Sequence, residues 1–323
     1  MPSELMLEKW SGEVNVVTIG ATKAEGGSRA GVIKVGGEKT LPFLFQEAPV
    51  AHKPAIAYEI WDVNPAEWPQ ELSAAYGPVL KDPFAWAEKC VKEFKAKLLC
   101  VKLQGAHPEF GNKTADEEAK FISKLLKTVD VPLIVLGCGD DEKDNLVLPA
   151  CCQAATGEKC LFGSAVQDNY KTLAAAALAD GHDIIAESPI DINIAKQLNI
   201  LISDMGMPLE RIVINPTIGA LGYGLEYAYS IMERARLAAL AGDKTVASPF
   251  IALIGQEAWR AKEAKISAQE MPLWGPESKR GVLWESVTAS ALIQSGADIL
   301  VMRHPQAIEK INKFIENLMD RKI

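Results

Sequence analysis

Short, predominantly apolar runs alternate with longer amphipathic stretches from about residue 56 onward. Runs of this kind are typical of parallel strands, which are covered on both faces and therefore lack an alternating polar side. The expected strands are 56–60, 98–103, 133–136, 160–162, 184–186, 212–214, 250–254 and 299–302.

Helix-start signals lie between several of these runs. They are Asp82 followed by Pro83, a capping box at 114–117, Asp168 before an alanine-rich stretch, and Pro305. About eight strand–helix units over about 270 residues match the size of a closed barrel better than that of an open doubly wound sheet. We therefore predict an α/β fold, a (β/α)8 TIM barrel that occupies residues 51–323.

Residues 1–50 lie outside this alternation. Stretches 13–19 and 30–35 are β-like, and Gly26 and Gly27 lie in the segment that joins them. Because neither GxGxxG nor GxxxxGK[ST] is present, the glycines indicate a flexible hairpin tip and not a phosphate loop. We predict an N-terminal β-hairpin extension that packs on the barrel or on a partner.

Composition and charge exclude several classes of protein. The 323 residues are 48% hydrophobic, which is ample for a large core. The net charge is −8 and the Lys and Arg residues are dispersed, so the electrostatic footprint of a nucleic-acid or membrane binder is missing. Residues 1–10 lack the pattern of an export signal, and no run approaches the roughly 20 apolar residues of a spanning helix. We expect a cytoplasmic protein that binds neither nucleic acid nor membrane.

Cysteine and histidine spacing gives no support for a metal site on this chain. No CxxC pair and no HExxH motif occurs. The cysteines are Cys90, Cys100, Cys138, Cys151, Cys152 and Cys160, and the histidines are His52, His107, His182 and His304. Cys160 begins an apolar run, and free cysteine is commonly buried as a small hydrophobic residue. We therefore predict that the cysteines are packing residues and that the chain binds no metal or iron–sulfur cluster.

Polar residues follow the expected strands, at the end of the barrel where such folds bind ligands. They are Asp62, Asn64, Gln104, Asp140, Asp141, Ser164, Glu187, Ser188, Asn215, Thr217, Gln256, Glu257 and Arg303. With Arg303 as the one prominent cation, the set does not favour a phosphate clamp. Acids such as Glu187 and Asp62 suit acid–base chemistry, but strand-end acids also cap helices, and no GxSxG elbow is present. We predict no catalytic residues.

Two expected strand-exit loops, 61–81 and 255–280, are unusually long. Long loops in a compact domain are usually functional or lid-like. The second loop contains Trp259 and Trp274, and the first begins at Trp61. Together the loops indicate a broad contact surface at the exit end of the barrel.

The most informative loop is 215–224, which reads NPTIGALGYG and directly follows the expected strand 212–214. Asn215 offers an amide and Thr217 a hydroxyl, and the three glycines allow a flat ligand to approach the backbone closely. We expect this loop to contact a ligand. The alternative is that it only forms a turn before a helix that begins near Leu225.

At these residues the sequence resembles the small subunit of the corrinoid iron–sulfur protein of the anaerobic acetyl-CoA pathway. The resemblance covers the full length and rests on residues 14–20, 58–62, 101–105 and 215–224. It implies a barrel of the type shared with pterin-dependent methyltransferases, acting as one half of a heterodimer. In that family the large subunit carries the [4Fe-4S] cluster and the cobamide-binding domain, and the mouth of the small subunit's barrel covers the corrin.

The resemblance also implies the chemistry and the partners. The cobalt of the cobamide takes the methyl group of methyltetrahydrofolate held on a separate methyltransferase, and then passes it to acetyl-CoA synthase/CO dehydrogenase. Such a carrier subunit positions and covers its cofactor without catalytic or metal-binding residues of its own. The expected cofactor contacts are Asn215, Thr217, Gly219, Gly222, Tyr223, Asp62, Gln104, Asp140 and Gln256.

Two other classes of protein stay open at this point. A free-standing pterin-binding methyltransferase would use an acid and amides at the strand ends, which Asp62, Asp140 and Asn215 supply. A structural barrel subunit would have a filled barrel and no ligand. The first would bind methyltetrahydrofolate alone, whereas the second would bind neither the pterin nor the cobamide.

Overall fold

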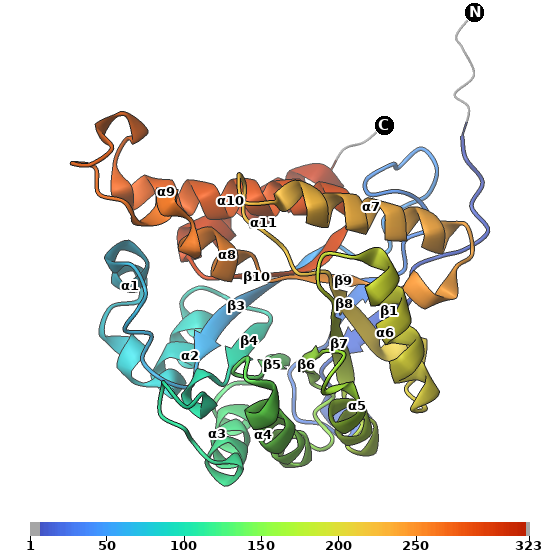
Figure 1. The fold of residues 1–323 in the computed structure, drawn as a ribbon, viewed down its shortest axis with the longest axis horizontal. Coiled ribbons are helices and arrows are strands. Elements are labelled where there is room, and N and C mark those ends of the chain that lie inside the picture. Colours follow the sequence, from blue (N-terminus) through green and yellow to red (C-terminus); the bar gives the residue numbers. More distant parts are fainter. Residues whose placement is uncertain (1–6, 321–323) are drawn as a thin grey trace, which may run out of the picture.

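A closed barrel of eight parallel strands forms the centre of the computed structural model, which describes residues 7–320 (Figure 1). The strand order is β10-β3-β4-β5-β6-β7-β8-β9, as in a (β/α)8 barrel. The strands are β3 (Ala55–Trp61), β4 (Leu99–Lys102), β5 (Leu133–Leu136), β6 (Leu161–Ala165), β7 (Asp183–Glu187), β8 (Ile212–Asn215), β9 (Phe250–Ala252) and β10 (Ala297–Met302). All eight expected strands are confirmed, with small shifts at their ends. The predicted extension begins at residue 1 and the predicted barrel ends at residue 323, and both of these residues lie outside the described range.

Helices surround the barrel, one long helix after each strand (Figure 1). These helices are α2 (Pro83–Lys92), α3 (Ala115–Thr128), α4 (Asp141–Ala154), α5 (Tyr170–Ala179), α6 (Ile192–Asp204), α7 (Leu225–Leu240), α10 (Glu277–Ser295) and α11 (Pro305–Met319). The two long exit loops add α1 (Gln70–Tyr76), α8 (Ile254–Arg260) and α9 (Lys262–Lys265). In Figure 1 these three short helices lie together on the left, at the end where β3 and β9 finish. None of the helices within residues 7–320 has the length and apolar character needed to cross a membrane.

Three of the four expected helix starts are confirmed. Asp82 accepts a hydrogen bond from the backbone N–H of Phe84 at 2.9 Å, at the start of α2. Thr114 and Glu117 form the capping box of α3, and Pro305 is the first residue of α11.

The fourth helix start was wrong by one residue. The N-cap of α5 is Asn169 and not Asp168. The Asn169 side chain does not cap the helix, because its Oδ1 accepts a hydrogen bond from Val166 N at 2.8 Å in the loop after β6. A local loop contact therefore replaced the capping contact that the sequence predicted.

The N-terminal extension contains the predicted hairpin, with β1 (Val16–Ile19) antiparallel to β2 (Ile33–Gly36). Val17, Ile19 and Val35 are buried in one apolar cluster with side chains from the barrel strands. In Figure 1, β1 lies to the right, away from the short helices of the exit loops. The hairpin therefore packs against the inside of the barrel at its amino-terminal end.

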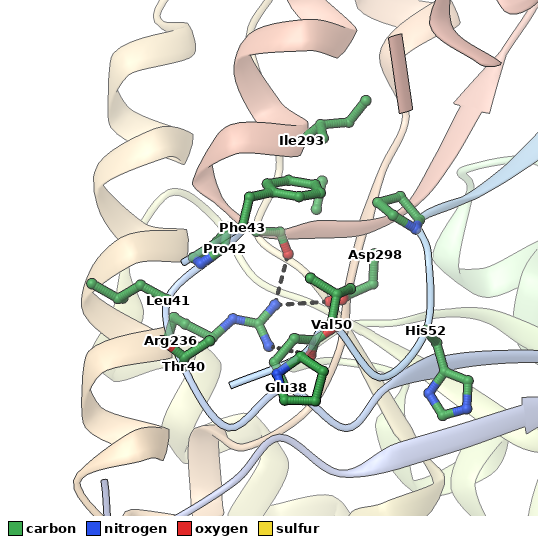
Figure 2. Close-up of a pocket in the computed structure, with 14 residues that line it drawn as sticks. Glu38, Thr40, Leu41, Pro42, Phe43, Val50, His52, Arg236, Ile293 and Asp298 are labelled. Carbon is green, nitrogen blue, oxygen red and sulfur yellow. Dashed lines mark hydrogen bonds and ion pairs between the residues drawn. The ribbon is translucent and has the colours of Figure 1, made fainter. Parts of the chain in front are cut away.

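An ion cluster joins the segment after the hairpin to the barrel (Figure 2). Arg236 on α7 donates from Nη1 to Glu38 Oε2 at 2.9 Å and from Nη2 to Asp298 Oδ2 at 3.0 Å. Nη2 also donates to the Gly296 carbonyl at 2.8 Å. Asp298 accepts a further bond from Phe250 N at 2.7 Å, so one buried cation connects the extension, α7, β9 and β10.

The inside of the barrel changes from apolar to polar along the strands. Side chains two residues apart on a strand point to the same side. The buried interior cluster contains Ala57, Cys100, Ile185, Val213 and Val301. Two residues further along the same strands or at their exits stand Glu59, Lys102, Glu187, Asn215 and Arg303. The hairpin end of the barrel is thus sealed by apolar packing, and the exit end presents charged groups and an amide.

All six cysteines are buried and unbonded, which confirms their prediction as packing residues. Burial raises the pKa of the Cys138 and Cys160 thiols to about 12. The thiolate is the form of cysteine that ligates metals. The described part of the chain holds no group of three or more His, Cys, Asp or Glu side chains arranged for a metal ion.

Candidate functional site

A cleft of about 420 Å³ opens at the mouth of the barrel. It lies between the exits of β3, β4, β5, β9 and β10, and both long exit loops contribute to it. Its aromatic side chains are Trp61, Trp68, Phe110 and Trp259, its cations are Lys102, Arg260, Lys265 and Arg303, and its amides are Gln104 and Gln256. The cleft therefore combines a mainly polar and charged lining with several aromatic side chains.

A buried ion pair forms the floor of the cleft. Arg303 donates from Nε to Glu59 Oε2 at 3.0 Å and from Nη2 to Oε1 at 2.6 Å. Trp61 Nε1 donates to the same carboxylate at 2.7 Å, and the guanidinium carbon lies 5.0 Å from the centre of the Trp68 ring. Burial opposes ionisation of Glu59, but the Arg303 charge and these hydrogen bonds leave the pKa of Glu59 below its ordinary value. The pair is thus held ionised between two tryptophans.

Lys102 is a second cation on this floor. Burial lowers the pKa of Lys102, and the charge of Glu59 partly opposes that effect. Its Nζ donates to Gln256 Oε1 at 3.3 Å and lies 5.5 Å from the centre of the Trp61 ring. The expectation that Arg303 is the one prominent cation at the strand ends was therefore wrong, because Lys102 is the last residue of a strand and was counted as part of the apolar run.

Of the predicted contacts that follow the first strands, only Gln104 lines the cleft directly. Asp62 is buried away from the interior, where its Oδ1 accepts from Gly105 N at 2.8 Å and its Oδ2 pairs with Lys113 Nζ at 2.5 Å. Burial, with repulsion from Asp62, raises the pKa of the neighbouring Glu118 to about 8. Asp62 thus ties the β3 exit to the β4 exit loop.

Asp140 has a structural partner as well. It is the N-cap of α4, and its Oδ1 accepts from Lys143 N at 2.9 Å. On the other side of the barrel, Gln256 on α8 lines the cleft through the contact with Lys102.

The base of loop 215–224 is held by its own polar groups. Asn215 is buried, and its Nδ2 donates to Glu187 Oε2 at 2.8 Å while its Oδ1 accepts from Thr217 N at 3.2 Å. Thr217 has a φ of +53° and donates from Oγ1 to the Ser188 carbonyl at 2.6 Å. These contacts join the exits of β7 and β8 and fix where the rest of the loop emerges.

The tip of the loop reaches the neighbouring exit loop. A Cβ on Gly219 would lie 2.1 Å from the Tyr223 carbonyl oxygen, so glycine is required there. Tyr223 is half-exposed, and its hydroxyl donates to Glu263 Oε2 at 2.9 Å and accepts from Lys262 N at 3.0 Å. Helix α7 then begins at Leu225, as expected.

Solved structures with the same architecture define the class of protein. Dihydropteroate synthase from Stenotrophomonas maltophilia superposes with a TM-score of 0.54 at 15% identity, over 84% of this chain and 95% of that one. Dihydropteroate synthase from Coxiella burnetii, in complex with pteroic acid, gives 0.53 at 13% identity, over 84% and 96%. The chain is thus a (β/α)8 barrel of the dihydropteroate synthase type, with a polar cleft at its mouth. At these identities the likeness concerns the fold alone.

The family itself follows from sequence similarity. The family described as CO dehydrogenase/acetyl-CoA synthase delta subunit matches residues 16–315, and the chain belongs to it. The acetyl-CoA decarbonylase/synthase complex subunit delta 1 of Methanosarcina thermophila is 36% identical over 97% of this chain and 72% of its own length. Subunit delta of the same complex from Archaeoglobus fulgidus is 37% identical over 96% and 70%. This membership confirms the resemblance to the corrinoid iron–sulfur protein small subunit.

Proposed function

We propose that the chain is the small subunit of a heterodimeric corrinoid methyl carrier, and that its barrel mouth covers a cobamide held by the large subunit. The observation that carries this proposal is the mouth itself, where amides and aromatic rings line an open cleft and the glycine-rich loop 215–224 bonds to one of the loops that line it. Among the described residues of the mouth, Glu59 is paired with Arg303, Asp62 with Lys113, and Asp140 caps a helix, so these acids are engaged in structural contacts. Such a mouth suits positioning and shielding better than proton transfer.

The residues at the mouth fit one face of a corrin. A cleft of about 420 Å³ is too small to enclose a cobamide, so it suits a cofactor that is presented from outside. Gln104 and Gln256 supply amide groups in the cleft, and Tyr223 on loop 215–224 is half-exposed and bonds to the β9 exit loop that lines it. Amides and hydroxyls pair with the amide groups at the edge of a corrin, and Gly222 allows close backbone approach. When bound, the cobamide supplies a cobalt that accepts and donates a methyl group.

The other residues predicted to contact the cofactor hold the loops of the mouth in place in this proposal. Asn215, Thr217 and Gly219 shape the loop that carries Gly222 and Tyr223. Asp62 and Asp140 orient the exits of β3, β4 and β5. Removing one such polar contact should change cofactor retention several-fold and not abolish it, since one hydrogen bond contributes about 1 kcal/mol.

The proposal names the partners by family. The large subunit would carry both the cobamide and the [4Fe-4S] cluster, a separate methyltransferase would present methyltetrahydrofolate, and acetyl-CoA synthase/CO dehydrogenase would receive the methyl group. The relatives are named as subunit delta of the acetyl-CoA decarbonylase/synthase complex, which supports a multi-subunit assembly. We propose that this assembly is cytoplasmic. We also propose that residues 1–50 form an extension of the barrel 51–323, because its hairpin completes the barrel core.

Spectra of the anaerobically purified chain with and without the large subunit test this function. A carrier subunit should show corrinoid absorption only in the assembled complex, and it should contain no iron when isolated. Binding of methyltetrahydrofolate by the isolated chain, followed by methyl transfer to free cobalamin, would instead establish a free-standing methyltransferase. A colourless complex that assembles normally and binds no cobamide would leave only the structural role.

The role of the loop tip is tested by Tyr223→Ala in the same complex. We expect a several-fold faster loss of cobamide, because the half-exposed ring lies on the loop that we propose contacts the corrin, and its hydroxyl bridges to Glu263. Leu237→Ala is the matched control. Leu237 is on α7, the helix that follows the loop, and is 41% exposed near the far end of that helix. Equal cobamide retention in Tyr223→Ala and Leu237→Ala would remove the loop tip from the proposed site.

A further inference from the structure

We propose that the mouth cleft contains a binding site for an anionic group, a carboxylate or a phosphate, that is held between Lys102 and Arg303. The inference concerns the same mouth as the proposed cobamide cover. It is drawn from the side chains of the cleft alone, however, and it applies to the isolated chain.

The first argument is an excess of buried positive charge. Lys102 and Arg303 both line the cleft, and Glu59 is the one carboxylate that lies between them on the described floor. Arg303 is 5% exposed, and Glu59 is 2% exposed. Both oxygens of Glu59 are taken by the guanidinium of Arg303, and Trp61 donates to one of them as well. The charge of Lys102 is therefore left without an ion-pair partner of its own.

The second argument is the number of donors that remain free. An ammonium group has three N–H donors, and the acceptor of Lys102 within the described chain is Gln256 Oε1 at 3.3 Å. Arg303 uses Nε and Nη2 on Glu59, while its Nη1 has no hydrogen-bond partner in the described part of the chain. Nη1 is also not fully buried, so it is accessible from the cleft. Two cationic donors thus face the cleft and can converge on one oxyanion.

The rim contributes one further cation at the β9 exit, Lys265, which is unpaired within residues 7–320. Arg260 also lines the cleft but pairs with Glu257 at 3.2 Å, and Glu67 is the carboxylate on the opposite wall. The protein as a whole has a net charge of −8, so this concentration of cations is local and contrasts with the rest of the chain. A cleft in which one sign of charge predominates concentrates ions of the opposite sign.

The surroundings strengthen the attraction for an anion. Burial lowers the pKa of Lys102, which means that its charged form lacks the solvation it would have in water. An anion placed beside Nζ would compensate that loss. The cleft volume of about 420 Å³ exceeds that of a bare phosphate, so the anionic group would be one end of a small organic molecule.

Titration calorimetry on the full-length isolated chain, at fixed ionic strength, tests the site with four probes. Benzoate and phenyl phosphate carry the two candidate anions, inorganic phosphate lacks the ring, and benzamide is the neutral match of benzoate. We expect at least one anionic ring compound to bind at least tenfold more tightly than benzamide. The better of benzoate and phenyl phosphate then tells carboxylate from phosphate.

Three variants assign the binding to the cleft. Lys102→Met should weaken binding of the preferred anion by at least about tenfold, which corresponds to about 1.4 kcal/mol. Lys102→Arg should keep most of the affinity. Lys171→Met removes one charge from the exposed surface of α5 and should have no effect. Circular dichroism confirms that each variant is folded before its affinity is compared.

The inference is overturned if the anions bind no more tightly than benzamide. It is also overturned if Lys102→Met, folded as the parent, binds the preferred anion as tightly as the parent does. Neither result bears on the cobamide cover, which depends on the spectra of the assembled complex. A complex without cobamide would in turn leave the anion site of the isolated chain untouched.

Discussion

Glu59→Gln is expected to lower the free energy of unfolding by about 3–5 kcal/mol, the usual cost of removing one partner from a buried ion pair. The replacement keeps the size of the side chain, removes its charge and turns one of its two acceptor oxygens into an N–H donor that faces other donors. Arg303 and Lys102 then remain as two buried cations without a carboxylate between them. Repulsion and lost solvation both act against the folded state.

Urea denaturation of the parent and the variant measures this change, and two controls isolate its cause. Glu309→Gln removes the charge from an ion pair of similar length, 2.7 Å to Lys313, whose side chains are more than half exposed. It should cost far less than Glu59→Gln, because solvent screens an exposed ion pair. Glu59→Leu combined with Arg303→Met removes both charges and should recover much of the loss. A loss in Glu59→Gln no larger than that in Glu309→Gln would show that the floor of the mouth is not a desolvated ion pair.

Arg236→Met should have a comparably large effect, about 3–5 kcal/mol, because it leaves Glu38 and Asp298 buried without their cation. The loss should depend on pH. Burial, with repulsion from Glu38, already raises the pKa of Asp298 to about 8, and Arg236 opposes that rise. Without Arg236 the pKa of Asp298 rises further. An acid whose folded-state pKa is raised contributes stability at low pH that is lost as the pH rises through that pKa.

Denaturation of Arg236→Met at pH 7 and at pH 9 measures this dependence. The deficit relative to the parent should be larger at pH 9, because folded Asp298 ionises above pH 8 in the parent but stays protonated in the variant, whose stability therefore continues to fall as the pH rises. Arg234→Met changes an exposed cation on the same helix and should stay within about 0.5 kcal/mol of the parent at both pH values. A deficit that is the same at pH 7 and pH 9 would mean that Arg236 does not lower the pKa of Asp298.

The fold could be predicted from the sequence because its elements are marked locally. Each barrel strand is a short apolar run, and Thr114 and Pro305 mark helix starts whatever packs around them. Asn169 shows the limit of such signals, since its side chain bonds to the preceding loop and not to the helix. A one-residue shift of that kind depends on the tertiary path of the loop.

The candidate site could be predicted only in part, because its parts depend on which side of each strand a residue faces. Glu59 and Lys102 lie inside two apolar runs and were treated as part of them, although a spacing of two residues from Ala57 and Cys100 places both inside the barrel. Asp62 has the opposite parity and pairs with Lys113 outside the barrel. The alternation of side chains along each strand was the available signal. It distinguishes the inside of the barrel from the outside only once the register of the closed barrel is known.

Hydrogen exchange of the assembled complex, with and without cobamide, tests most directly whether the mouth covers the cofactor. Backbone amides in residues 61–69, 215–224 and 254–274 surround or approach the cleft, whereas the hairpin strands β1 and β2 lie at the opposite end of the barrel. The proposed function predicts that cobamide slows exchange in these three mouth segments and leaves β1 and β2 unchanged. Equal exchange in the mouth segments with and without cobamide, in a complex that retains the cofactor, would contradict it.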